Sequence, residues 1–212
     1  MLRKVLLICG IVSSLLCVVT DIFAGMQYEG YDFTSQAVSE LFAIGAPTSR
    51  LVVPLFTLFD VLLVAFAWGI WLSADRNRVL RVMSLMVIGN AIIGLMLWNF
   101  FPLHMRGTES TFTDTMHVIL ASNPFVPLSV GLGVFAFRNW FRYYSIFTIL
   151  LLIVPATFVF LNAQQVATNQ PTPWLGLTER ISIYSVLLWY SVLAIVLLRK
   201  QPMLKYTNQN LK

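Results

Sequence analysis

Six long runs of apolar residues alternate with short polar segments along the whole chain. The runs lie near residues 5–23, 51–72, 79–100, 115–137, 143–161 and 181–198. Each is close to the length of roughly 20 residues that an α-helix needs to cross the hydrocarbon core of a bilayer. The pattern therefore predicts an all-α integral membrane protein, with one six-helix transmembrane domain over residues 1–212.

Composition excludes a soluble globular protein. Of the 212 residues, 58% are hydrophobic and only 11% are charged, whereas soluble domains carry about 25% charged residues. The mean hydropathy is +0.79 over the full length, so the apolar excess is not confined to one segment. The segments between the runs are short, and we expect no soluble domain among them.

Positive charges gather on one side of the predicted spans. Eleven of the fourteen Lys and Arg residues fall there: Arg3, Lys4, Arg76, Arg78, Arg81, Arg138, Arg142, Arg199, Lys200, Lys205 and Lys212. Such residues are retained on the cytoplasmic side. We therefore expect an inner (cytoplasmic) membrane protein with cytoplasmic N- and C-termini and a cytoplasmic tail over 199–212. The net charge of +5 then reflects topology and contact with anionic lipid, and we expect no nucleic-acid partner.

The first outer loop has the pattern of a short amphipathic helix near residues 32–44. Apolar residues recur from Phe33 to Phe42, and polar residues share the opposite face. Asp32 can cap its start, and Gly45 is typical of its end. The helix either lies on the lipid surface or acts as a lid, with Gln36 and Glu40 pointing into the mouth of the bundle.

Both histidines lie near the second outer loop, where they suggest a metal site. Asp114 and His117 are three residues apart at a predicted helix start, so they project from one face. With His104 they could supply three ligands to a catalytic zinc ion, with Glu40 or Glu179 as base or fourth ligand. The alternative is that Asp114 only stabilises the helix N-terminus.

Three arginines lie on the outer side, where the orientation rule disfavours them: Arg50, Arg106 and Arg180. Acidic residues from neighbouring helices can neutralise them, and the candidates are Glu40, Asp114 and Glu179. Alternatively, an arginine fork binds the carboxylate or phosphate of a ligand.

Asp60 lies near the centre of the second predicted span, where an ionised carboxylate is costly. Counted from the outer ends of their spans, Asn90 and Ser14 lie at about the same depth. A protonated Asp60 bonded to these residues would clasp the helices. A titrating Asp60 would instead indicate a proton relay or an ion site.

Several of these residues form a pattern of their own. Tyr31, the run from Ser35 to Leu41, Gly45-Ala46-Pro47, Phe101-Pro102 and an acidic residue before His117 occur in this order. With them, the chain resembles the bacterial and archaeal membrane proteins grouped as domain of unknown function 998. The resemblance implies a six-helix membrane fold without an assigned reaction. It carries over five positions: Gln36, Ser39, Glu40, Pro102 and His117.

The polar residues collected at the outer face lead to three functional hypotheses. The first is a mouth that binds a lipid head group or a small polar or anionic ligand; its candidate residues are Gln36, Ser39, Glu40, Arg50, Arg106, Glu179 and Arg180. The second is a metal-dependent hydrolase of an outer-leaflet lipid, with zinc on His104, Asp114 and His117 and with Glu40 as general base. The third is an ion- or proton-coupled transporter that uses Asp60.

Overall fold

Six apolar helices, each long enough to cross a membrane, make up the described part of the computed structural model, which covers residues 1–162, 165–166 and 168–199. Five crossings are single helices: α1 (Leu2–Gln27), α2 (Ser49–Leu72), α3 (Arg78–Phe100), α6 (Trp140–Leu161) and α8 (Leu175–Arg199). The sixth is divided into α4 (Phe112–Ala121) and α5 (Phe125–Ala136). In these residues the chain is all-helical apart from one isolated bridge between Ile44 and His104, which confirms the predicted class.

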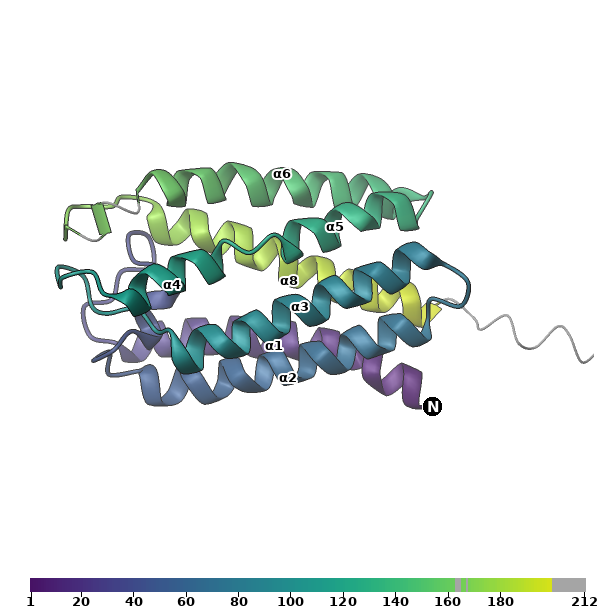
Figure 1. Ribbon diagram of the computed structural model, residues 1–212, viewed down its shortest axis with the longest axis horizontal. Coiled ribbons are helices and arrows are strands. Elements are labelled where there is room, and N and C mark those ends of the chain that lie inside the picture. Colours follow the sequence, from purple (N-terminus) through teal and green to yellow (C-terminus); the bar gives the residue numbers. More distant parts are fainter. Residues whose placement is uncertain (163–164, 167, 200–212) are drawn as a thin grey trace, which may run out of the picture.

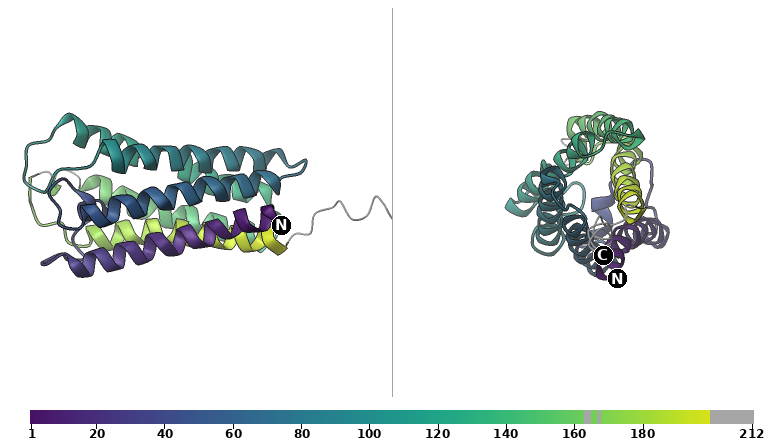
Figure 2. Two further views of the ribbon diagram at one scale, coloured as in Figure 1. Left: turned by 90° about the horizontal axis from the view of Figure 1, so that it is seen from below. Right: turned by 90° about the vertical axis from the view of Figure 1, so that its right-hand side faces the viewer.

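The helices form a closed ring. Going round it, α1 packs on α2, α2 on α3, α3 on α5, α5 on α6, α6 on α8, and α8 on α1 again, whereas α4 packs chiefly against α3. Figure 2 shows this ring end-on. Large side chains fill its interior, among them the fully buried Phe66, Phe141, Trp189 and Tyr190. First and last helices are thus neighbours, which matters for the site below.

The start of α1 and the end of α8 lie at the same end of the bundle (Figure 1). The predicted tail beyond Arg199, with Lys200, Lys205 and Lys212, lies outside the described residues. At the opposite end, three segments come together: residues 28–48, 101–111 and 168–174. We call this end the mouth. It is the end that the charge pattern predicts to face outward.

The helix predicted near residues 32–44 is much shorter in the structure. Asp32 does cap a turn, but the only regular element is a five-residue 3-10 helix, η1 (Val38–Phe42). The carbonyl groups of residues 33–36 accept hydrogen bonds from other parts of the chain instead of from residues further along the loop. An α-helix needs these carbonyls for its own ladder, so the segment cannot form one.

The fourth span is interrupted in the structure. α4 ends at Ala121, and Pro124 precedes α5. The side-chain oxygen of Asn123 accepts a hydrogen bond from the backbone N–H of Phe125 at 3.1 Å, so it satisfies one of the free donors at the start of the new helix. Pro155, by contrast, lies within a continuous α6.

Close approach of α1 and α2 depends on Gly69. A β-carbon at this position would lie 2.9 Å from the backbone nitrogen of Leu7, which cannot move aside as a side chain does. Small residues at such crossings let two membrane helices pack closely.

We therefore predict that Gly69→Ala lowers the free energy of unfolding by about 1–3 kcal/mol, because it overpacks this crossing. Gly131→Ala is the matched control, since a β-carbon at Gly131 meets no atom within 4 Å. It should leave stability unchanged or raise it by up to about 1 kcal/mol. Unfolding in mixed micelles measures both, and equal effects of the two substitutions would contradict the helix crossing described here.

Candidate functional site at the mouth of the bundle

Hydrogen bonds to backbone carbonyls join the first loop to the other two segments of the mouth and to α8. The N–H of Ile44 donates to the carbonyl of Leu103 at 2.7 Å, and the N–H of Leu177 donates to the carbonyl of Thr34 at 3.1 Å. The hydroxyl of Thr172 donates to the carbonyl of Ser35 at 2.9 Å. The first loop is therefore fixed between the other two.

A buried ion pair lies beneath this loop. The guanidinium of Arg180 on α8 donates from Nε and Nη2 to the two carboxylate oxygens of Asp21 on α1, each at 2.9 Å. Both residues are almost fully enclosed, with exposed fractions of 6% and 1%. The hydroxyl of Tyr184 also donates to Asp21, at 2.5 Å. This bidentate geometry is the strongest that an arginine and a carboxylate can form.

The remaining donors of Arg180 hold the first loop. Nη1 donates to the carbonyls of Phe33 and Gln36, both at 3.0 Å, and Nη2 donates to the hydroxyl of Tyr31 at 2.6 Å. The rings of Phe33 and Tyr31 lie 4.9 and 5.5 Å from the guanidinium carbon. Burial raises the pKa of the Tyr31 hydroxyl, so it stays protonated. Arg180 therefore has no donor left for a ligand.

This pairing corrects the expected partners of Arg180. Glu179, its neighbour in sequence, points another way and accepts a hydrogen bond from the backbone N–H of Val38 at 2.6 Å. Successive side chains on a helix project about 100° apart, so the two residues serve different contacts. Glu179 therefore binds the start of η1.

Arg106 and Glu40 form a second bidentate pair; Glu40 is one of the three acids named in the sequence analysis as possible partners of the outer arginines. Nε and Nη2 of Arg106 donate to the carboxylate of Glu40 at 2.6 and 2.7 Å. The same guanidinium donates to the Thr172 hydroxyl and to the Ser35 carbonyl, both at 2.8 Å. Gln36 donates to Glu40 at 3.2 Å. Of the five N–H groups of an arginine, only one on Nη1 remains for a further partner.

Arg50 and Ser39 stand apart from these pairs. Arg50 is exposed and lines a shallow second depression beside Trp98 and Pro102. Ser39 is half-buried within η1. Of the carried-over positions, Gln36 and Glu40 thus meet at the Arg106 pair.

The predicted zinc ligands do not converge. Within the described residues, no group of three His, Cys, Asp or Glu side chains is placed to hold a metal ion. Asp114 accepts from the backbone and Nδ1 of His104 at 2.7 and 3.0 Å, and from the backbone and hydroxyl of Thr111, both at 2.8 Å. His117 is buried, and its Nδ1 lies 2.8 Å from the carbonyl oxygen of Phe101. Asp114 therefore caps α4, which is the structural alternative of the sequence analysis.

Asp60 has a different partner from the one that its depth suggested. The indole N–H of Trp98 donates to Oδ2 of Asp60, whereas Asn90 lies 3.5 Å from the amide of Asn123. Oδ1 of Asp60 has no hydrogen-bond partner in the described residues. The depth of a residue along its span gives the position of its Cα atom only. The long side chain of Trp98 reaches Asp60 from a different depth.

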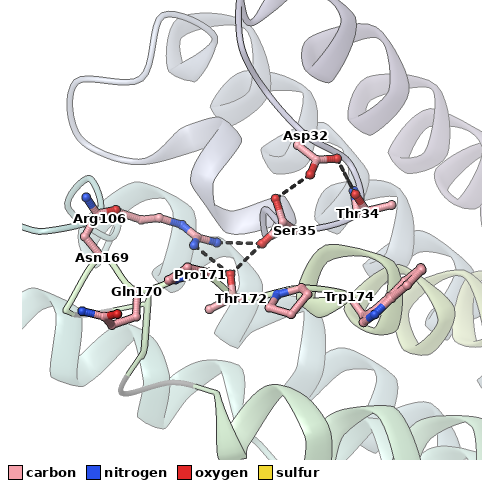
Figure 3. Close-up of a pocket in the computed structure, with 10 residues that line it drawn as sticks. Asp32, Thr34, Ser35, Arg106, Asn169, Gln170, Pro171, Thr172 and Trp174 are labelled. Carbon is pink, nitrogen blue, oxygen red and sulfur yellow. Dashed lines mark hydrogen bonds between the residues drawn. The ribbon is translucent and has the colours of Figure 1, made fainter.

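A pocket of about 540 Å³ opens beside the Arg106 pair (Figure 3). Its walls come from the first and last loops and from Arg106: Asp32, Thr34, Ser35, Arg106, Asn169, Gln170, Pro171, Thr172, Pro173 and Trp174. Figure 3 shows Arg106 and Asn169 at one side and Trp174 at the other. The volume is within the range of small-molecule sites.

The last loop forms a wall of the pocket that the sequence did not lead us to expect. Its signal is the run from Asn169 to Trp174, in which two prolines separate polar residues. Asn169 and Trp174 have left-handed backbone angles, with φ of 55° and 71°. Such angles in residues other than glycine cost of order 1–3 kcal/mol and gather at ligand sites.

We predict that Arg180→Gln lowers the free energy of unfolding by about 3–5 kcal/mol, because it leaves the Asp21 carboxylate buried without its cation. The double variant Asp21→Asn with Arg180→Gln should recover part of this loss. Arg50→Gln is the control, since Arg50 is exposed, and should change stability by less than about 0.5 kcal/mol. Equal unfolding midpoints for the Arg180 and Arg50 variants would contradict a stabilising buried pair.

Comparison with known proteins confirms the resemblance seen in the sequence. The family model described as "Protein of unknown function (DUF998)" matches residues 11–196, from within α1 to near the end of α8. No curated protein and no solved structure gives a significant match. The chain is therefore a multi-pass membrane protein that belongs to the DUF998 family.

Proposed function

We propose that this protein binds a small polar ligand, in the first place a lipid head group, in the pocket at its mouth. The pocket itself is the observation that carries the proposal, because it combines polar groups with apolar walls. The side chains of Asn169 and Gln170 are exposed and have amide donors and acceptors to offer. The Trp174 side chain is 60% exposed at the start of α8, a position typical of a membrane interface.

We further propose that the mouth faces outward from the cytoplasmic membrane. The support is the distribution of cations along the helices. The opposite end of the bundle carries Arg3, Arg199 and the arginines in or beside the short turns after α2 and α5. The mouth end has three cations in the sequence, which are Arg50, Arg106 and Arg180. Retention of positive loops in the cytoplasm then orients the pocket toward the outer leaflet.

The other two hypotheses receive less support from the geometry. The hydrolase has no ligand set for its metal in the described residues. The transporter retains one favourable observation, the unpartnered and buried Oδ1 of Asp60. Unchanged ion-dependent uptake in Asp60→Asn proteoliposomes would remove this support.

Native mass spectrometry of the protein purified from its membrane tests the binding proposal. Wild type should carry a bound small molecule or lipid, and Trp174→Ala should reduce its occupancy roughly tenfold, a change of about 1.4 kcal/mol. Trp68→Ala is the matched control, because Trp68 is 50% exposed on α2, toward the opposite end. The same bound masses at the same occupancy in all three proteins would contradict a ligand site at the mouth.

A further inference from the structure

One carboxylate of the pocket is left without a cation. At the mouth, Asp21 is neutralised by Arg180, and Glu40 is neutralised by Arg106. Asp32 lines the pocket, and no cationic side chain pairs with it among the described residues. The unbalanced charge in the pocket wall is therefore negative, which does not favour the alternative in which Arg106 or Arg180 binds an anion.

Asp32 is ionised at any physiological pH. Its carboxylate accepts hydrogen bonds from the hydroxyl of Thr34 at 2.5 Å, the hydroxyl of Ser35 at 2.7 Å and the backbone N–H of Thr34 at 2.9 Å. These bonds stabilise the charged form and lower the pKa of Asp32 to about 2. A carboxylate has room for about four hydrogen bonds, so Asp32 retains acceptor capacity.

An exposed aromatic ring also lines the pocket. The backbone bond from Leu177 to Thr34, at 3.1 Å, ties the turn of Asp32 to the first turn of α8, directly after Trp174. Both Asp32 and Trp174 line the pocket (Figure 3). The face of an indole ring attracts ammonium groups, and a carboxylate in the same pocket attracts them by its charge. This end of the pocket suits an organic cation.

The opposite end offers hydrogen bonds without net charge. The Arg106 charge is balanced by Glu40, so that its one remaining N–H acts as a polar donor. The exposed amides of Asn169 and Gln170 lie beside it. These groups can bind the oxygen atoms of an ester phosphate, but they give no strong attraction to a free anion.

From this arrangement we infer that the ligand carries an ammonium group, which lies between Asp32 and Trp174 while its phosphate or other oxygen-rich part contacts the Arg106 end. A phosphoethanolamine head group has this chemistry. The inference rests on the proposed function and specifies its ligand class. It also makes Asp32 and Trp174 the residues that determine specificity.

The experiment compares two lipids that share acyl chains and phosphate but differ in the head group. Phosphatidylethanolamine or phosphatidylglycerol is titrated into delipidated full-length protein, and binding is followed by native mass spectrometry. We expect about tenfold tighter binding of phosphatidylethanolamine, and we expect Asp32→Asn to abolish this preference. Glu29→Gln is the control, because Glu29 is an exposed acid of the same loop that does not line the pocket. It should keep the preference.

The outcomes separate this inference from the proposed function. If both lipids bind equally, or phosphatidylglycerol binds more tightly, and Trp174→Ala weakens both, the pocket stands and the ammonium inference is overturned. If Trp174→Ala affects neither lipid, both ideas fail. A preference that Asp32→Asn leaves intact also overturns the inference. Titration with soluble phosphoethanolamine then distinguishes the two sources of this head group. If the soluble compound displaces the bound lipid, the pocket recognises the free zwitterion; if it does not, the acyl chains of a membrane lipid are needed for binding.

Asp32→Asn keeps the side-chain oxygen that accepts from Thr34, so the turn should persist. Thermal unfolding checks this point. A midpoint equal to that of wild type, together with loss of the lipid preference, assigns the effect to the charge of Asp32. A lowered midpoint with the preference retained would contradict the assignment.

Discussion

The structure of the mouth depends on one buried ion pair, Asp21 with Arg180. A charge inside a membrane protein is costly unless it is paired and its remaining hydrogen bonds are satisfied. Here Asp21 on the first helix and Arg180 on the last helix pair with each other, and these two helices are neighbours in the ring. The remaining donors of Arg180 bind carbonyls of the first loop. The carbonyls of Phe33 and Gln36 complete the set of acceptors around the guanidinium.

The shape of the pocket follows from this constraint. Because Arg180 holds the carbonyls of the first loop, the loop folds as a turn and a short 3-10 helix instead of an amphipathic helix. The turn then presents Asp32 to the pocket, and the Ser35 carbonyl meets Arg106 and Thr172 from the two other segments. Arg106 and Arg180, two of the three arginines that were candidates for an anionic ligand, are thus part of the framework. The unpaired charge in the wall of the pocket is that of Asp32.

The sequence was sufficient for the membrane-spanning helices, but not for the first loop or for the contacts between helices. Apolar runs locate the six crossings, but the last helix begins at Leu175, before the predicted residue 181. The predicted span excluded the charged Arg180, which is buried with a partner in the structure. Charge and side identified Glu40 as a possible partner of an outer arginine, but they did not assign it to Arg106. Other pairings depend on which helices are neighbours and on how far each side chain reaches. The examples are Asp21 with Arg180 and Asp60 with Trp98. Hydrophobic periodicity contains neither kind of information.

Hydrogen–deuterium exchange of the Arg180→Lys variant tests most directly whether the buried pair organises the mouth. A lysine keeps the charge but lacks the planar fork that contacts Asp21 and the loop carbonyls together. The account predicts faster exchange in residues 31–44 than in wild type, with little change in α2 and α3. Exchange in residues 31–44 that matches wild type, or that rises equally throughout the bundle, would contradict it.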